Sequence, residues 1–260
     1  MKSVKSYDFF GHTAIVNFPE NFNLSDKKKF ALNLMKKQKS IKTVLEKSGN
    51  VKGRLRKPET KFIAGENTKE VFYKENNCVF YFDVDKTYFS PRLSNERKEI
   101  SSLIKKDEEV LVLFAGVAPF SIVIAKNSKA KKIYSSEINR EANKYAKKNI
   151  ELNKIGEKVE LVSGDARKLS GKLKKKFDVV VMARPQLKDM FLEVGFNFVK
   201  KGGRIYYYDF CKVDEVEYIV GKIKEEAAKA KKKIKILKKK KAGELAPYKI
   251  RLRVDLQVLG

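Results

Sequence analysis

The sequence VLVLFAGVAPF, at residues 110–120, decides the fold expected for this chain. Its apolar first half is typical of a buried strand, and it passes through small residues around Gly116 into the helix-like run SIVIA at residues 121–125. Where a strand stops at glycine and a helix begins, a ligand can approach backbone N–H groups at the positive end of the helix. The turn is therefore a candidate cofactor site.

Strand and helix patterns alternate on both sides of this run. Strands are expected at residues 109–114, 132–136, 159–163, 177–182 and 203–208, and helices at 96–105, 119–126, 140–153, 188–199 and 213–228. Such alternation indicates parallel strand–helix–strand units in a doubly wound sheet. Two strands, at 233–238 and 248–258, then follow each other without a helix between them. An antiparallel pair closing a parallel sheet predicts the α/β fold of class I methyltransferases, a Rossmann-like seven-stranded sheet, rather than a nicotinamide-binding fold.

The first part of the chain follows a different pattern. A hairpin is expected around Gly11, then a helix capped by Ser25 that runs to residue 37, an apolar segment at 41–45, and strands at 70–74 and 78–84. We therefore expect a small α/β domain at residues 1–88, ahead of a methyltransferase domain at residues 89–260. The basic run VKGRLRKP, at residues 51–58, indicates that the small domain binds RNA.

The composition favours a polyanionic partner. The 260 residues include 59 Lys and Arg against 32 Asp and Glu, a formal charge of +27, which makes RNA or DNA the leading class of partner. The alternative is a lysine-rich, thermophilic proteome in which lysine only solvates the surface. Cys78 and Cys211 lie too far apart to suggest a disulfide framework or a metal site. Without a signal peptide or a membrane-spanning run, a cytoplasmic protein with no membrane association is expected.

Four features follow consecutive expected strands. They are Gly116, Glu137, Asp165 and the segment Met182-Ala183-Arg184-Pro185. The ends of these strands converge on one crevice, where Glu137 would accept ribose hydroxyls and Asp165 would face an adenine amino group. No Lys-Ser or Lys-Thr pair follows the glycine turn, so S-adenosylmethionine fits better than a nucleotide bearing phosphates. The expected cofactor-binding residues are Phe114, Gly116, Val117, Glu137, Ile138, Asn139, Asp165, Ala166, Met182 and Ala183.

With these features in place, the chain resembles the archaeal and eukaryotic family of tRNA guanine-37 N1-methyltransferases, including its wyosine-pathway relatives. The resemblance rests on VKGRLR at residues 51–56, YFSPRLSNER at 88–97, FAGVAPFS at 114–121 and GGRIYYY at 202–208. It implies transfer of a methyl group from S-adenosylmethionine to N1 of guanosine 37 in tRNA. It leaves open a second methylation at the same position, at C7 of the wyosine intermediate imidazoguanosine.

The resemblance also implies the residues that act on guanine. The arginine and glutamate of the Ser-Pro-Arg motif match Arg92 and Glu96, and an upstream family arginine matches Arg56. Guanine N1 carries a proton that must leave before N1 can attack a sulfonium methyl, so Glu96 is expected to be the general base. Arg56 or Arg92 would stabilise the negative charge that grows on guanine O6. Pro185 would keep the turn of the loop after the fourth strand.

Each of these residues also has an ordinary structural explanation. Glu96 can serve as a first-turn acid that favours the helix dipole, Arg92 as an ion pair and Arg56 as a phosphate contact. Three departures from the family are also visible. The chain has Ala183-Arg184-Pro185 where the methyltransferases usually carry Asn-Leu-Pro or Pro-Leu-Pro, Val112 replaces an acid, and Ala118 replaces the last glycine of the first turn.

Two alternative functions stay open at this point. One is transfer of the aminocarboxypropyl group from the same cofactor, since relatives with that activity share the core and also lack a tRNA-elbow-binding domain at the N-terminus. The other is a non-catalytic tRNA-binding protein on a methyltransferase scaffold. In every case the self-sufficient fold favours a monomer.

Overall fold

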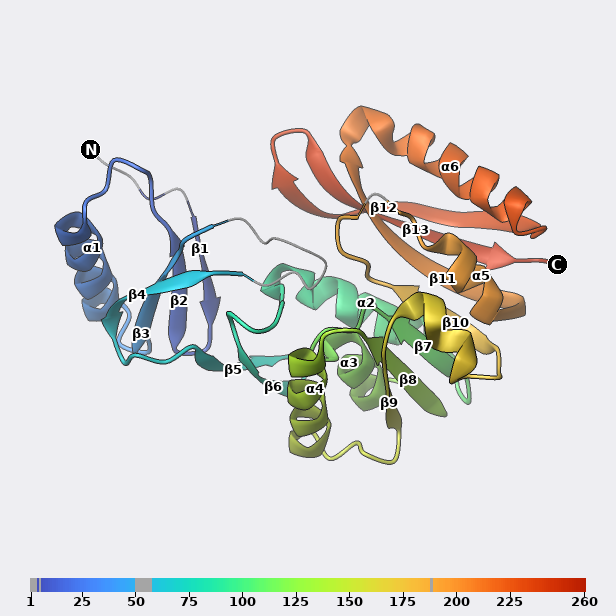
Figure 1. Ribbon diagram of the computed structural model, residues 1–260, viewed down its shortest axis with the longest axis horizontal. Helices are drawn as coiled ribbons and strands as arrows, with labels where there is room; N and C mark the ends of the chain where they lie inside the picture. The colour runs from blue at the N-terminus through green and yellow to red at the C-terminus, as the bar shows by residue number, and fades with distance from the viewer. Residues whose placement is uncertain (1–3, 5, 50–57, 188) are drawn as a thin grey trace.

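The computed structural model describes residues 4, 6–49, 58–187 and 189–260 (Figure 1). Its larger part is a seven-stranded sheet in the order β12-β13-β11-β10-β7-β8-β9. The strands are β7 (Glu109–Leu113), β8 (Lys132–Glu137), β9 (Val159–Ser163), β10 (Phe177–Met182), β11 (Val199–Lys212), β12 (Ile234–Ala246) and β13 (Lys249–Val258). β13 lies between β11 and β12 and runs antiparallel to the other six strands. The predicted class I methyltransferase fold is confirmed.

Helices cover both faces of this sheet. One face packs against α2 (Ser94–Leu103), α3 (Pro119–Asn127) and α4 (Arg140–Leu152), and the other against α5 (Leu192–Phe198) and α6 (Val216–Lys229). The alternation within β7 shows why both faces must be covered, since Val110 and Val112 join one buried cluster while Leu111 and Leu113 join the other. A strand that is apolar on both sides is stable only between two layers of helices.

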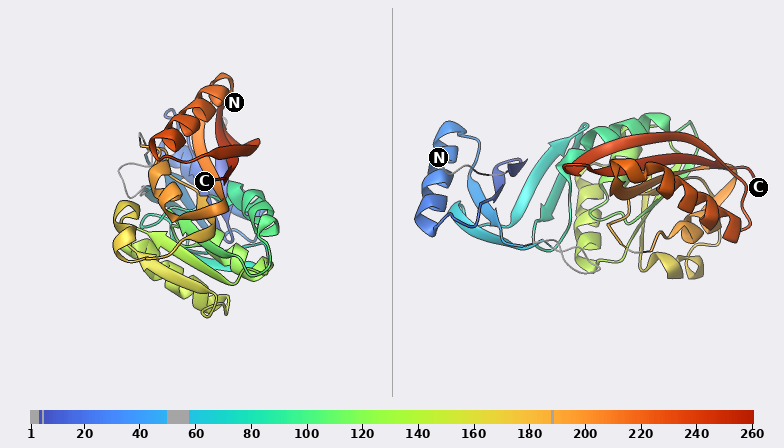
Figure 2. Two further views of the ribbon diagram at one scale, coloured as in Figure 1. Left: turned by 90° about the vertical axis from the view of Figure 1, so that its right-hand side faces the viewer. Right: turned by 90° about the horizontal axis from the view of Figure 1, so that it is seen from above.

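The N-terminal part is a small α/β unit with its own core. Its sheet has the order β1-β2-β3-β4, with one helix, α1, on one face. The elements are β1 (Ser6–Phe10), β2 (Thr13–Asn17), α1 (Leu24–Lys37), β3 (Thr43–Lys47) and β4 (Thr60–Gly65). This part extends the molecule along its long axis, as Figure 2 shows from above.

A hairpin connects the two parts. It consists of β5 (Glu70–Glu75) and β6 (Cys78–Asp83), which form a separate two-stranded sheet. The buried side chains of Asn149 on α4 and of Asn153, the C-cap of α4, accept hydrogen bonds from the backbone N–H groups of Tyr81 and Val79, at 2.7 and 2.9 Å. On the other side, Phe10 and Leu45 of the N-terminal sheet lie in one buried cluster with Phe82 and Phe89. The division expected at residues 88 and 89 stays a prediction.

Two local expectations were wrong, and one strand was not predicted. The cap of α1 is Asn23 rather than Ser25, because the Asn23 side chain accepts a hydrogen bond from the N–H of Asp26 at 2.8 Å. The sequence did not predict β4. The helix expected to begin at residue 188 begins only at Leu192, since Phe191 has a left-handed backbone with a φ of 57°.

Candidate active site

A cavity opens at the carboxyl ends of β7, β8, β9 and β10, where the sequence predicts the cofactor. Among the predicted residues, those that line it are Phe114, Gly116, Glu137, Ile138, Asn139, Asp165, Ala166, Ala183 and Pro185. Val117 and Met182 do not line it, because both are fully buried in the clusters on either side of the sheet. The structure therefore brings most of the predicted cofactor residues together.

Glu137 connects two neighbouring strand ends within this cavity. One of its carboxylate oxygens accepts a hydrogen bond from the backbone N–H of Gly116 at 2.8 Å, and the other accepts one from the N–H of Asn139 at 2.7 Å. Burial raises the pKa of Glu137, and these backbone N–H groups act in the opposite direction. The remaining lone pairs of the carboxylate could accept two hydroxyl groups of a ribose.

Three residues of the turn after β7 have left-handed backbones, namely Phe114, Gly116 and Ala118. Gly116 has a φ of 58°, a conformation that glycine adopts without steric cost. Ala118 has a φ of 66° and precedes α3, where the sequence departs from the family glycine. An alanine there is strained, but its methyl group is fully buried in the core.

The cavity is also lined by side chains that the sequence did not assign to the site. They come from the segment before α2 and from β11 and β13, and include Tyr88, Ser90, Tyr208, Phe210 and Arg251. Arg97 also lines the cavity, forms a bidentate ion pair with Glu75 and donates a hydrogen bond to the carbonyl of Ser90 at 3.0 Å. Arg97 thus fixes the segment that forms this wall.

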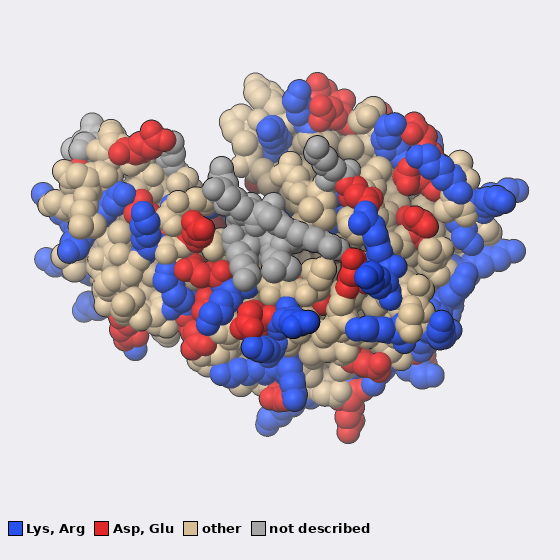
Figure 3. All heavy atoms as spheres, in the orientation of Figure 1, with Lys and Arg blue, Asp and Glu red and all other residues tan. Residues whose placement is uncertain are grey.

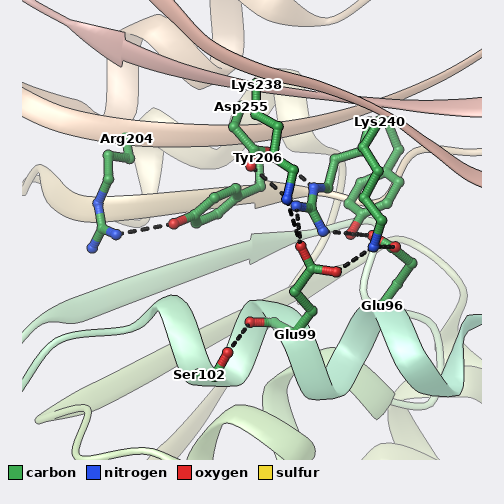
Figure 4. A network of polar contacts seen from close by, with 10 residues as sticks. Glu96, Glu99, Ser102, Arg204, Tyr206, Lys238, Lys240 and Asp255 are labelled. Carbon is green, nitrogen blue, oxygen red and sulfur yellow. Dashed lines mark hydrogen bonds and ion pairs between the residues drawn. The ribbon is translucent and has the colours of Figure 1, made fainter.

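Glu96 lies behind this wall rather than in the cavity lining. It is buried, and it accepts hydrogen bonds from the Tyr208 hydroxyl at 3.0 Å, from Arg253 at 2.7 Å and from Lys240 at 2.6 Å. Figure 4 shows Glu96 and Glu99 on α2 pointing toward the cations of β12 and β13. Tyr208, which lines the cavity, is the side chain that links Glu96 to it.

Arg92, one of the two predicted arginines, is not among the residues that line the cavity. The Arg92 side chain is 56% exposed and pairs with Asp8 of β1 at 2.9 Å, which matches the alternative of an ion pair. Arg56 lies outside the described residues. The structure therefore does not bring Arg92 together with the cofactor residues.

The departure from the family motif after β10 has a structural role. The Arg184 side chain is buried, donates to the Tyr207 hydroxyl at 2.9 Å and pairs with Asp209. It also donates to the carbonyls of Leu187 at 3.0 Å and Asp189 at 3.2 Å. Arg184 thereby anchors to β11 the loop that contains Pro185.

Comparison with known families agrees with this architecture. Residues 71–237 match the TRM5/TYW2 methyltransferase domain, and residues 1–68 match the TYW2 N-terminal domain. The chain belongs to the TRM5/TYW2 methyltransferase family. This confirms the family predicted from the sequence motifs.

Three TRM5/TYW2 relatives illustrate the range of named activities. The chain is 34% identical to the tRNA (guanine(37)-N(1))-methyltransferase Trm5b of Pyrococcus abyssi, over 97% of this chain and 74% of that protein. It is 45% identical to the tRNA (guanine(37)-N(1))/4-demethylwyosine(37)-methyltransferase Taw22 of Nanoarchaeum equitans, over 58% of this chain and 49% of that protein. It is also 34% identical to the tRNA(Phe) (4-demethylwyosine(37)-C(7)) aminocarboxypropyltransferase of Methanocaldococcus jannaschii, over 66% and 68%.

Solved structures of the TRM5/TYW2 family have the same fold. The structure of aTrm5 with tRNALeu superposes with a TM-score of 0.84 at 32% identity, covering 98% of this chain and 72% of that one. The M. jannaschii TYW2 structure with AdoMet superposes with a TM-score of 0.72 at 25% identity, covering 97% and 99%.

Proposed function

We propose that this protein transfers the methyl group of S-adenosylmethionine to N1 of guanosine 37 in tRNA. The observation that carries the proposal is a single cavity with a cofactor end on β7 to β10 and a separate aromatic and cationic end on β11 and β13. Relatives that match nearly the whole chain, such as Trm5b of P. abyssi, support the reaction and the substrate. Figure 3 shows Lys and Arg spread over both parts of the molecule, which suits an RNA partner.

The residues of the cofactor end fit this cofactor. Glu137 would hold the ribose hydroxyls, Asp165 would face the adenine, and Gly116 allows close approach of the backbone. When bound, the cofactor supplies a methyl group on an electrophilic sulfonium. Among the described residues, no group of three or more His, Cys, Asp or Glu side chains is placed to hold a metal ion.

Glu96 remains the proposed base for the proton of guanine N1. A base must come within hydrogen-bond reach of that proton, and catalytic contacts often tighten only when the substrate is bound. Glu96 is separated from the cavity by Tyr208, so we infer one of two routes for the proton of guanine N1. Either RNA binding draws Glu96 forward, or the Tyr208 oxygen takes the N1 proton while the Tyr208 hydroxyl proton passes to Glu96. Arg92 and Arg56 remain proposals for stabilising charge on guanine O6.

Aminocarboxypropyl transfer is the second candidate, because residues 1–68 match the TYW2 N-terminal domain and a relative is named as an aminocarboxypropyltransferase.

Methylation of a wyosine intermediate is supported by the name of Taw22 and by Ala183, whose small side chain leaves room at the cavity wall. Aminocarboxypropyl transfer and methyl transfer use different carbon atoms attached to the sulfur of the same cofactor.

Labelled cofactor separates these reactions. The protein is incubated with a tRNA transcript carrying G37, with cofactor labelled either in the methyl group or in the carboxyl carbon, and the nucleosides are identified by mass spectrometry. We expect methyl label in 1-methylguanosine and none in a transcript carrying A37. Retention of carboxyl label by a tRNA that carries 4-demethylwyosine at position 37 would favour the second candidate. Binding of tRNA without any product would favour a non-catalytic protein.

We further propose that the protein acts as a monomer in the cytoplasm. No helix in the described ranges is long and apolar enough to span a membrane. Light scattering at several protein concentrations tests the oligomeric state.

A further inference from the structure

We propose that Arg251 binds a backbone phosphate of the RNA beside the nucleotide that enters the cavity. This inference rests on the proposed function for the identity of the RNA, but its argument comes from the arginines of the cavity wall. Three arginines line the cavity, namely Arg97, Arg184 and Arg251. The first two are neutralised by buried carboxylates, Glu75 and Asp209.

Arg251 differs from the other two. Its guanidinium lies over the Phe210 ring, 5.0 Å from the ring centroid, and Phe210 lines the same cavity. Within the described part of the chain, no Asp or Glu forms an ion pair with Arg251. A guanidinium presents planar hydrogen-bond donors that suit phosphate oxygens, and stacking on an aromatic ring leaves those donors available.

The topology places this cation on the acceptor side of the cavity. Arg251 is paired in register with Phe210, so the beginning of β13 lies at the carboxyl end of β11. Both strands lie on one side of β10, whereas β7, β8 and β9, which carry the cofactor residues, lie on the other. An anion bound by Arg251 is therefore expected to belong to the acceptor and not to the cofactor.

The surroundings favour an RNA strand over a small anion. The turn between β12 and β13 carries Tyr248, which is 80% exposed, and beside it the exposed cation Lys249. Exposed aromatic rings next to cations are typical of surfaces that hold single-stranded RNA by stacking and phosphate contacts. The hairpin thus continues the proposed contact outward from Arg251.

The test compares Arg251→Gln with Lys235→Gln in the full chain. Lys235 is an exposed cation on β12, near the opposite end of the same hairpin, so both variants lose one positive charge. Binding of the G37 transcript is measured over a range of KCl concentrations, and binding of S-adenosylmethionine by calorimetry. We expect R251Q to weaken tRNA binding about tenfold or more and to lower the slope of log affinity against log salt by about 0.7 to 0.9. Lys235→Gln should behave as the wild type, and cofactor affinity should not change.

Other outcomes would overturn the proposal. If R251Q weakened cofactor binding and left tRNA binding intact, Arg251 would serve the carboxylate of the cofactor. An unchanged salt slope, or equal losses in both variants, would also refute a phosphate contact. Arg251→Lys, which keeps the charge, should recover most of the slope, so failure of this rescue in a folded variant counts against the proposal. These measurements do not need catalysis. The lower salt dependence of tRNA binding in R251Q would therefore support the phosphate contact even if the wild type transfers no methyl group.

Discussion

At the scale of single residues, Glu137 is the central side chain of the proposed cofactor site. Its carboxylate is half-buried in the cavity wall at the junction of β7 and β8, and it must be ionised to accept two hydroxyl groups besides the N–H groups of Gly116 and Asn139. Because burial raises its pKa, the carboxylate takes up a proton at a higher pH than an ordinary glutamate. Proton binding and ribose binding therefore compete at this side chain.

The first prediction concerns the pH dependence of cofactor binding. Affinity for S-adenosylmethionine should fall as the pH is lowered toward the raised pKa of Glu137, since the protonated form loses acceptor capacity. Calorimetric titrations between about pH 5 and 8 measure this dependence. Glu137→Gln should bind weakly and show no such decline. A wild-type affinity that stays constant over this range would contradict the role given to Glu137.

The second prediction concerns the glycine turn. Gly116→Ala places a Cβ at a φ of 58°, which costs about 1 to 2 kcal/mol, and that Cβ would lie 3.4 Å from the carbonyl oxygen of Tyr88. We expect a modest loss of thermal stability and a larger loss of cofactor affinity, because Gly116 faces the cavity. Ala118 shows that the fold tolerates alanine in this conformation when the methyl group is buried. Unchanged cofactor affinity in G116A would argue against close approach of the ligand.

At the scale of secondary-structure elements, α2 is fastened to the sheet by a buried group of charges. Arg253 of β13 is fully buried and pairs with Glu96, Glu99 and Asp255. Although burial opposes it, contact with Arg253 and Lys240 lowers the pKa of Glu99 to about 2. The group keeps α2, and with it Arg97 and the cavity wall, in a fixed position.

The third prediction compares a buried ion pair with an exposed one. Arg253→Met removes the buried cation shared by Glu96 and Asp255 and should lower the free energy of unfolding by about 3 to 5 kcal/mol. Arg92→Gln removes the exposed pair with Asp8 and should cost less than about 1 kcal/mol. Urea denaturation of both variants measures the difference. Similar losses in the two variants would mean that the Arg253 group contributes little.

The sequence predicted elements better than it predicted contacts between them. The alternation of strand and helix patterns was sufficient to predict β7 to β10. The absence of a helix between β12 and β13 was sufficient to place an antiparallel strand in the sheet. The partners of Glu96 could not be predicted, because Lys240 and Arg253 are 144 and 157 residues away in the chain. Arg184 was visible only as a departure from the family motif, and its partner Asp209 comes from another strand. Local sequence patterns do not predict such ion pairs between residues that are far apart in the chain.

At the scale of the whole molecule, the two parts share one core. Phe10 and Leu45 from the N-terminal sheet pack in the same cluster as Phe82 and Phe89, so neither part can expose its side of this contact without cost. The apolar contact couples the unfolding of the N-terminal sheet to that of the methyltransferase sheet.

The fourth prediction follows from this coupling. Calorimetry of the full chain should show one cooperative transition, and Phe10→Ala should lower the stability of the whole chain by about 3 to 5 kcal/mol. Leu32→Ala, at a side chain of α1 that is 61% exposed, should change the stability by less than about 0.5 kcal/mol. A separate early transition, sensitive to F10A alone, would show that the N-terminal sheet unfolds independently.

The position of β13 in the sheet has a consequence for the order in which the protein is made. The residues of the cofactor end lie between Phe114 and Ala183, so they leave the ribosome well before β13. Until residues 249–258 have been synthesised, Glu96 and Glu99 lack Arg253, and the cavity lacks Arg251 on its wall. A growing chain can therefore assemble its cofactor end early, while the surface that receives RNA is completed last.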